Sequence, residues 1–220
     1  MLRALGRRSR GSDWLEGDAL KRDDVAEASD GVSLIVHAVN PPNYQNWDKV
    51  VLPMIDNTIE AAEISGARIL LPGTIYNFDP STAPLISAGS PQRPRSRKGA
   101  IRVALEQRLR VAAPQVQSIV LRAGDFFGPG ARSSWFSQAM VAPGKPVSRV
   151  VRMSRGDGHS WAYLPDLAEA AARLMDVQHT LLPFEDIQFE GYYDASGSGM
   201  VDTVLSLVPT KPTTSTFPGG

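Results

Sequence analysis

Val32-Ser-Leu-Ile-Val-His-Ala-Val39 is a short apolar run rich in β-branched residues, a composition that indicates a buried strand. Two similar runs follow, Ala-Arg-Ile-Leu-Leu at 67–71 and Ser-Ile-Val-Leu-Arg at 118–122. Continuous apolar strands are typical of a parallel sheet that is buried on both faces. Helical patterns separate the three runs, so strand and helix alternate. This alternation favours an α/β fold with right-handed βαβ crossovers.

Apolar stripes and terminal signals predict three helices. The first covers 53–65, opening at Pro53 and stopping at Gly66, a residue suited to cap a helix end. The second covers 98–112, and the third covers 166–176 with its first aspartate as the N-cap. Each is long enough to connect two parallel strands.

Composition excludes several classes of function. Hydrophobic residues make up 42% of the chain and charged residues 21%, the formal net charge is zero, and there is no cysteine. Disulfides, thiolate nucleophiles and cysteine-ligated metals are therefore excluded. The three histidines lack metal-site spacing, the arginine-rich runs are short, and no apolar run is long enough to span a membrane. We expect a cytoplasmic protein with no nucleic-acid or membrane partner.

Residues 91–106 read Pro-Gln-Arg-Pro-Arg-Ser-Arg-Lys-Gly-Ala-Ile-Arg-Val-Ala-Leu-Glu. This segment resembles the P-x-x-P-x-S-x-Y-x-x-x-K-x-x-x-E pattern of the extended short-chain dehydrogenase/reductase superfamily, which includes NAD(P)-dependent epimerases and dehydratases. The prolines, the serine and the glutamate are in register. Lys98 stands where that family has its tyrosine acid/base, and Arg102 stands where it has the partner lysine.

Further segments resemble the same family in the expected order, and together they cover roughly residues 2–191. The resemblance implies a Rossmann-like doubly wound parallel sheet, NAD or NADP as cofactor, and a small-molecule substrate that could be a nucleotide sugar. The segments are Leu2–Arg7, Gly17–Leu20, Ile35–Asn40, Thr74–Asn77, Leu121–Gly130 and Trp161–Ala170.

Carried over residue by residue, the resemblance names two groups of site residues. The catalytic candidates are Lys98 and Arg102, together with Thr74 and Tyr76, because the family's serine falls at Pro72, which has no hydroxyl. The cofactor-binding candidates follow predicted strands and would meet at one end of the sheet. They are Arg7, Asp18, Ala19, Ala38, Val39, Asn40, Ala123 and Asp125.

Other roles remain open for several of these residues. Lys98 and Arg102 lie one helical turn apart, and two neighbouring cations favour a neutral lysine, which could act as a base. Arg102 could instead hold a phosphate or carboxylate, or form an ordinary surface pair with Glu106. Asp18 could be a turn residue. His37 is expected to be a hydrogen-bonded core residue rather than a ligand.

The family's glycine-rich turn is missing, because no G-x-x-G-x-x-G occurs in the chain. In the strand order 3-2-1-4-5-6 the strand before that turn is central, so residues 2–5 should be detached from 32–39 or should pair in its place. We interpret this as a truncated start and expect weak binding of NAD(P).

The predicted organisation is one NAD(P)-binding domain over 1–193, with partial substrate-binding elements at about 125–193. The Gly-, Ser-, Thr- and Pro-rich tail over 194–220 is expected to be disordered. One alternative function stays open, that of a non-catalytic protein that senses nucleotides or acts as a scaffold. Assembly into a homodimer is a separate expectation.

Overall fold

A computed structural model describes residues 3–5, 13–41, 46–153 and 158–217 of the chain. The chain forms two compact units: one comprises Met1–Arg122 and His179–Gln188, and the other comprises Ala123–Gln178 and Phe189–Gly220. This division differs from the single domain expected up to residue 193. The polypeptide leaves the first unit after Arg122 and returns to it for one strand.

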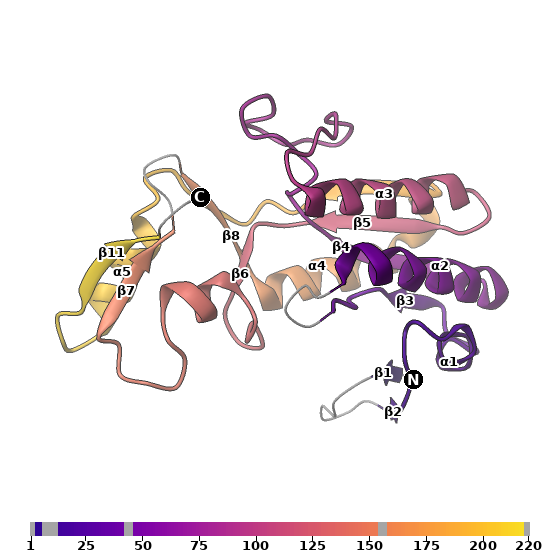
Figure 1. Ribbon diagram of the computed structural model, residues 1–220, viewed down its shortest axis with the longest axis horizontal. Helices are drawn as coiled ribbons and strands as arrows, with labels where there is room; N and C mark the ends of the chain where they lie inside the picture. Colours follow the sequence, from indigo (N-terminus) through magenta and orange to yellow (C-terminus); the bar gives the residue numbers. More distant parts are fainter. Residues whose placement is uncertain (1–2, 6–12, 42–45, 154–157, 218–220) are drawn as a thin grey trace. The chain divides into compact units, whose positions relative to one another are not determined.

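The first unit contains the predicted parallel sheet. Its order is β3-β4-β5-β9, and every neighbouring pair is parallel. Figure 1 labels the first three of these strands. The three apolar runs are therefore confirmed as parallel neighbours. The fourth strand comes from much later in the chain and was not predicted. The bounds are β3 (Leu34–Val36), β4 (Arg68–Gly73), β5 (Ser118–Arg122) and β9 (Phe184–Gln188).

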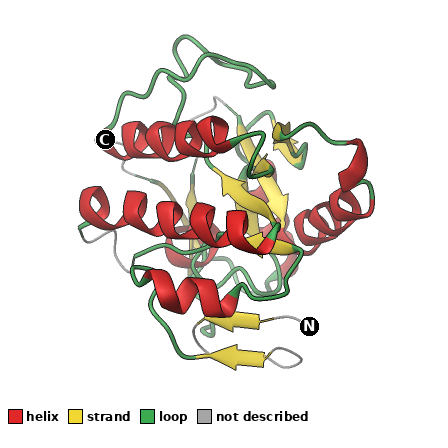
Figure 2. Cartoon of the chain, turned by 90° about the vertical axis from the view of Figure 1, so that its right-hand side faces the viewer, coloured by secondary structure: helices red, strands yellow, loops and turns green. Residues whose placement is uncertain are grey.

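The first two strands are separate from this sheet. β1 (Arg3–Leu5) and β2 (Asp13–Leu15) pair with each other in parallel and form a sheet of their own. They lie beside the short helix α1 (Arg22–Ala28), near the N-terminus in Figure 2. The prediction that residues 2–5 would be detached from β3 is confirmed for the part that is described.

The two long helices differ from prediction mainly at their starts. α2 spans Trp47–Ser65, so Pro53 lies inside the helix and does not begin it. Its end is as predicted, since Gly66 adopts φ 70° as the left-handed cap that glycine accommodates. α3 spans Arg97–Ala112, and Ser96 caps its N-terminus.

α2 and α3 pack together against one face of the sheet. The buried cluster between them contains strand residues of β4 and β5 and helix residues one or two turns apart. The opposite face of the same strands is also buried, which explains why these runs are apolar without alternation. The cluster comprises Trp47, Val51, Ile55, Ala62, Ile69, Leu71, Leu105, Leu109, Val116 and Val120.

The second unit contains two small sheets, one of order β10-β8-β6 and one that pairs β11 with β7. In α4 the predicted N-cap Asp166 instead lies in the first turn, and Tyr163 occupies the N-cap position. The elements are β6 (Asp125–Phe127), a π-helix (Phe136–Met140), β7 (Arg149–Arg152), β8 (His159–Tyr163), α4 (Leu164–Asp176), β10 (Tyr192–Asp194), α5 (Gly199–Leu207) and β11 (Thr213–Thr216). A short 3-10 helix (Gln178–Thr180) connects the units.

The expected disorder of residues 194–220 is wrong for the part that the structure describes. Helix α5 buries Met200 and Val201 in a cluster with Trp161, and β11 pairs with β7 along four residues. Backbone pairing does not depend on apolar side chains, so the polar Thr-Thr-Ser-Thr segment forms a strand in spite of its composition.

Candidate functional site

The ends of β3 and β4 bring several predicted residues to one edge of the first unit's sheet. The two strands are parallel, with Val36 opposite Leu70, so their carboxyl ends lie on the same side. β3 leads into Ala38, Val39 and Asn40, which are exposed, and β4 leads into Thr74 and Tyr76. Ligands of open parallel sheets bind at this edge.

Asn40 connects the end of β3 to helix α2. Its side-chain oxygen accepts a hydrogen bond from the indole Nε1 of Trp47 at 2.9 Å. Trp47 is the first residue of α2 and is only 5% exposed. The Asn40 oxygen therefore has a structural partner, and the predicted contact between Asn40 and a cofactor stays a prediction.

Lys98 and Arg102 have different surroundings although they lie one turn apart on α3. Lys98 is exposed, whereas Arg102 is half-buried, with its guanidinium carbon 4.8 Å from the centre of the Trp47 ring. The alternative of a surface pair between Arg102 and Glu106 is wrong, because Glu106 is buried and binds Arg122.

The start of α3 packs directly on the loop that follows β4. Ser96 Oγ accepts a hydrogen bond from Gly99 N at 3.0 Å, which caps the helix. A Cβ atom at Gly99 would clash with the carbonyl oxygen of Tyr76. Only glycine permits this approach, and it places the Thr74–Tyr76 segment against the first turn of the helix.

Thr74 has two structural contacts. Its hydroxyl accepts a hydrogen bond from Tyr76 N at 2.9 Å, and its carbonyl oxygen accepts one from Arg122 Nη1 at 2.9 Å. Since the hydroxyl acts as an acceptor in this turn, its own proton can still be donated to a ligand. Tyr76 is 42% exposed, so it is not a packed core aromatic.

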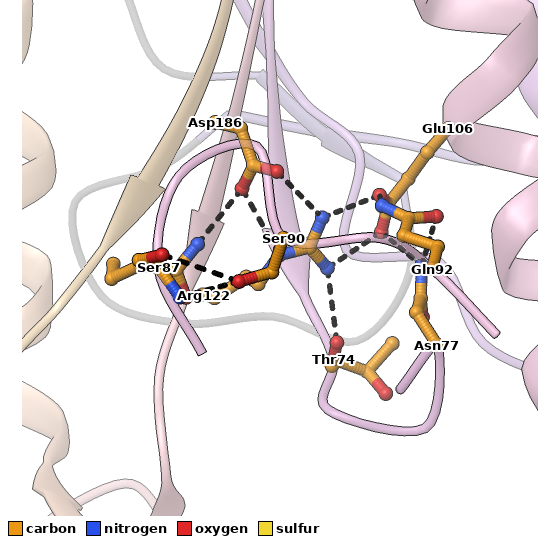
Figure 3. A network of polar contacts seen from close by, with 9 residues as sticks. Thr74, Asn77, Ser87, Ser90, Gln92, Glu106, Arg122 and Asp186 are labelled. Atoms are coloured by element: carbon orange, nitrogen blue, oxygen red, sulfur yellow. Dashed lines mark hydrogen bonds and ion pairs between the residues drawn. The ribbon is translucent and has the colours of Figure 1, made fainter. Parts of the chain in front are cut away.

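Below this loop lies a buried ion cluster centred on Arg122 (Figure 3). The Arg122 side chain is 1% exposed and contacts Glu106 of α3 at 2.8 and 2.5 Å and Asp186 of β9 at 3.0 and 3.3 Å. Burial alone would lower the pKa of Arg122, but the hydrogen bonds and charges of the two carboxylates outweigh it and raise the pKa.

Glu106 also holds both ends of the loop between β4 and α3. Its carboxylate accepts hydrogen bonds from Asn77 Nδ2 at 2.8 Å and from Gln92 Nε2 at 2.6 Å. The network thus fixes the β4 end, the helix and the loop to one another (Figure 3). The sequence placed Glu106 in register with the family pattern but did not reveal this role. Arg122, a charged residue at the end of an apolar strand, was the feature of the sequence that could have indicated a buried ion pair.

His37 is a buried core residue, as the sequence predicted. It is 4% exposed, and its Nδ1 lies 2.8 Å from Thr58 Oγ1. The Thr58 hydroxyl donates its one proton to the Met54 carbonyl, so Nδ1 of His37 must be the donor to Thr58. Burial, and secondarily the positive charge of Arg102, lower the pKa of His37 from 6.5 to about 4.

Asp18 is a turn residue before α1. Its Oδ1 accepts a hydrogen bond from Leu20 N at 3.0 Å, and its own N–H donates to Asp24 at 2.8 Å. The neighbouring Ala19 carbonyl accepts from Asn57 Nδ2 at 3.0 Å. The predicted adenine contact of Asp18 stays a prediction, and Arg7 lies outside the described residues.

Ala123 and Asp125 belong to the second unit. Asp125 Oδ2 lies 2.8 Å from His159 Nε2, and the His159 ring lies 4.4 Å from that of Trp161. Both members of the pair are partly exposed. The sequence analysis missed this contact because 34 residues separate the two side chains. The predicted role of Asp125 in cofactor binding stays a prediction.

Among the described residues, no group of three or more histidine, cysteine, aspartate or glutamate side chains is arranged to hold a metal ion. Within the same ranges, no helix is both long and apolar enough to cross a membrane.

Comparison with solved structures shows the same fold in known enzymes. MoeE5 in complex with UDP-glucose and NAD has a TM-score of 0.74 and 17% identity, covering 98% of this chain and 76% of its own. The UDP-Glc/GlcNAc 4-epimerase of Campylobacter jejuni has a TM-score of 0.73 and 15% identity, with coverages of 96% and 73%. A monomeric L-threonine 3-dehydrogenase from metagenome data has a TM-score of 0.78 and 12% identity, with coverages of 99% and 75%.

No protein-family model and no curated protein matches the sequence. The likeness to solved structures is low in identity and nearly complete in coverage of this chain, so it establishes the fold. The chain has the same Rossmann-like fold as these solved structures, as its alternating strands and helices predicted.

Proposed function

We propose that this protein is an NAD(P)-dependent oxidoreductase, epimerase or dehydratase that acts on a nucleotide sugar. One observation carries the proposal: exposed Asn40 and Tyr76 and half-buried Thr74 lie at the carboxyl ends of β3 and β4, where ligands bind in such sheets. The solved structures of this fold support it, since one is in complex with UDP-glucose and NAD and another is a UDP-Glc/GlcNAc 4-epimerase.

Each residue at this edge could bind a ligand or transfer a proton in a specific way. The Thr74 hydroxyl can donate a hydrogen bond to a ligand oxygen, and exposed Tyr76 can pack on a sugar or base. Exposed Lys98, when neutral, can accept a proton, and Arg102 can hold an anionic group. NAD(P), when bound, would supply hydride transfer.

The described residues fit only part of NAD(P). Asp18, Ala19, Ala38, Val39 and Asn40 could surround an adenosine, and they are the described cofactor residues we assign in the first unit. The pyrophosphate does not fit this chain, because the sequence has no glycine-rich turn opening a helix after a strand. We therefore expect the chain alone to bind NAD(P) weakly.

A specific observation favours a second candidate, a non-catalytic protein that senses a nucleotide or acts as a scaffold. Lys98 stands in the place of the family's tyrosine and Arg102 in the place of its lysine, and the Arg102 guanidinium lies against the Trp47 ring. A protein that kept the sheet and lost the reaction would show this arrangement. Ligand binding without turnover would identify it.

The experiment uses an extended protein, in which a strand, a glycine-rich turn and a helix from an NAD-binding structure of this fold are fused before Met1. Cofactor fluorescence is followed while UDP-glucose, dTDP-glucose or another nucleotide sugar is added. Oxidation or reduction of the cofactor that requires the sugar supports the enzyme proposal. An epimerase or dehydratase returns its cofactor to the starting state, so the sugar product is followed as well by chromatography. Saturable sugar binding with no change in the cofactor and no conversion of the sugar supports the second candidate.

We also propose assembly into a homodimer through α2 and α3. Val111 is 71% exposed and Ile64 is 70% exposed on these helices. Ile59, Val111 and Ala112 help to line an apolar hollow of about 330 Å³ between them. Exposed apolar surface of this kind is typical of protein–protein contacts. Light scattering coupled to gel filtration tests the proposal. We expect the unmodified chain to be a dimer and Val111→Glu to be a monomer. An unmodified chain that is monomeric would contradict the proposal.

A further inference from the structure

The second unit contains an aspartate–histidine pair on one face of its three-stranded sheet. β6 and β8 are parallel, with Asp125 opposite Trp161, and His159 lies two residues before Trp161 in β8. Side chains two residues apart in a strand point to the same face, so Asp125, His159 and Trp161 share one face. This arrangement places Asp125 Oδ2 at 2.8 Å from His159 Nε2.

The Asp125 carboxylate determines which ring nitrogen of His159 carries a proton. An ionised carboxylate can only accept hydrogen bonds, so Nε2 of His159 must be the donor. In the neutral ring, Nδ1 then has an unshared electron pair and can accept a proton. Within the part of the chain that the structure describes, no hydrogen bond to Nδ1 is found. The His159 side chain is 22% exposed, so the ring is partly open to solvent.

The other neighbours of the His159 ring leave Nδ1 unused. Trp161 is 2% exposed, and the centre of its ring lies 4.4 Å from that of the His159 ring. Asp194 faces His159 from β10. The two carboxylate oxygens of Asp194 accept hydrogen bonds from Ser196 Oγ at 2.8 Å and from Met200 N at 3.1 Å. Asp194 therefore holds the start of α5, and Asp125 is the carboxylate that orients the ring.

A carboxylate, an oriented imidazole and an open ring nitrogen are the parts of a general base. The carboxylate fixes the tautomer of the imidazole and stabilises the imidazolium that forms when the other nitrogen takes a proton. While the ring is neutral, the charge of Asp125 disfavours a phosphate or carboxylate group beside Nδ1. The chemical group that fits is a neutral O–H donor, such as a sugar hydroxyl.

We propose that His159 is a general base of the second unit, which accepts a proton from a ligand hydroxyl at Nδ1, and that Asp125 is its positioning residue. The O–H bond breaks as the N–H bond forms, its electron pair stays on the oxygen, and the imidazolium later returns the proton to the ligand or to water. For the ligand to be a nucleotide sugar, the inference rests on the proposed function. His159 then adds a second acid–base group to Lys98 of the first unit, as a reaction that moves two protons requires.

Reaction of the 220-residue chain with diethyl pyrocarbonate at neutral pH tests whether Nδ1 is available. The reagent acylates an unprotonated imidazole nitrogen, and mass spectrometry of the peptides gives a separate rate for each histidine. Exposed His179 and buried His37 are internal references. We expect His159 to react at a rate comparable to that of His179. A rate for His159 as low as that of His37 in the folded chain overturns the proposal.

The same reaction separates an oriented base from a histidine that only joins two strands. Asp125→Asn keeps the shape of the side chain and loses its charge. It should slow the acylation of His159 several-fold, because the carboxylate stabilises the positive charge that the ring acquires as Nδ1 attacks. The matched control is Asp176→Asn at the exposed end of α4, which should leave the rate unchanged. Equal rates for Asp125→Asn and the parent chain overturn the proposal.

Turnover by the extended protein tests the role in the reaction, with the nucleotide sugar that it converts as the probe. His159→Gln should lower kcat by about 10² to 10⁴ with little change in KM, because the base acts in the transition state. Added imidazole should restore part of the lost turnover, which a purely structural histidine would not permit. Asp125→Asn should also lower kcat and leave KM nearly unchanged. His179→Gln removes an exposed histidine and should leave both quantities unchanged.

The two kinds of experiment distinguish failure of the base from failure of the proposed function. If the extended protein converts a nucleotide sugar and His159→Gln leaves kcat unchanged, the proposed function stands and the base fails alone. If the extended protein converts no sugar, the proposed function fails. The acylation rates of His159 in the parent chain and in Asp125→Asn then decide the base, since they need no substrate.

Discussion

Arg122 Nη2 lies 2.5 Å from Glu106 Oε2, and both side chains are almost completely buried. This pair joins strand β5 to helix α3, and through Asn77 and Gln92 it also anchors the loop that carries Thr74 and Tyr76. The edge of the sheet that we assign to ligand binding thus rests on a buried polar network. Each member of the network satisfies charges or hydrogen bonds of another.

Glu106→Ala should destabilise the first unit strongly. The substitution leaves the buried Arg122 charge with Asp186 as its remaining carboxylate, and breaking a buried ion pair costs about 3 to 5 kcal/mol of unfolding free energy. Urea denaturation measures the change. The control, Glu169→Ala, removes an exposed pair with Arg173 and should leave stability nearly unchanged. A small effect of Glu106→Ala would show that the network contributes little.

Gly99→Ala should be destabilising, although alanine normally stabilises a helix relative to glycine by about 1 kcal/mol. The added Cβ would clash with the Tyr76 carbonyl oxygen, and overpacking of this kind costs about 1 to 3 kcal/mol. The sign of the change in thermal midpoint is therefore diagnostic. A rise in the midpoint would mean that α3 does not approach the Thr74–Tyr76 segment closely.

Stability should depend on pH through His37. Its pKa is about 4 in the folded chain, against an ordinary histidine value of 6.5, so the unfolded chain binds a proton that the folded chain excludes. The free energy of unfolding should therefore fall as pH falls from about 6.5 to 4, by at most about 3 kcal/mol. Above about pH 6.5 the contribution is complete.

Urea denaturation across this pH range, compared between the parent chain and two histidine variants, isolates the effect. His37→Gln should lose this part of the pH dependence, whereas the exposed His179→Gln should keep it. Equal slopes for the parent chain and His37→Gln would show that His37 titrates normally in the folded state.

Lys98→Ala tests the assignment of a base in the extended protein. If Lys98 transfers a proton in the transition state, turnover should fall by about 10² to 10⁴ while substrate affinity changes little. Steady-state kinetics separate the two quantities, and Lys49→Ala on α2 is the control. Unchanged kinetics would return Lys98 to the role of a solvent-exposed charge.

The central sheet could be predicted from the sequence because its signals are local. Three β-branched apolar runs became the parallel strands β3, β4 and β5, and Gly66 ended α2 at the predicted residue. β9 could not be predicted in this way. Its residues Phe-Glu-Asp-Ile-Gln carry two acids, and they join the sheet by backbone pairing with β5, a distant part of the chain, where Asp186 also pairs with Arg122.

The sequence predicted which residues lie at the candidate site, but it did not predict which side chains they contact. Ordered motifs placed Asn40, Thr74 and Lys98 near strand ends and a helix start. Their partners come from side chains distant in sequence, such as Arg122 to Thr74, and no local pattern reveals these pairs. The prediction of disorder after residue 194 was wrong for a related reason. Composition shows only that the segment has few apolar side chains, whereas β11 is held in place by backbone pairing with β7.

This chain has a Rossmann-like fold and lacks the glycine-rich turn that holds the pyrophosphate in NAD(P)-binding proteins, and calorimetric titration with NAD and NADP measures what that turn contributes. The chain alone should show no micromolar binding, because it lacks the helix N-terminus and backbone N–H groups that normally bind the pyrophosphate. The extended protein, which has them, should bind one of the two cofactors with a dissociation constant of micromolar order. Micromolar binding by the chain alone, or no binding by the folded extended protein, would show that the glycine-rich turn does not decide cofactor binding in this fold.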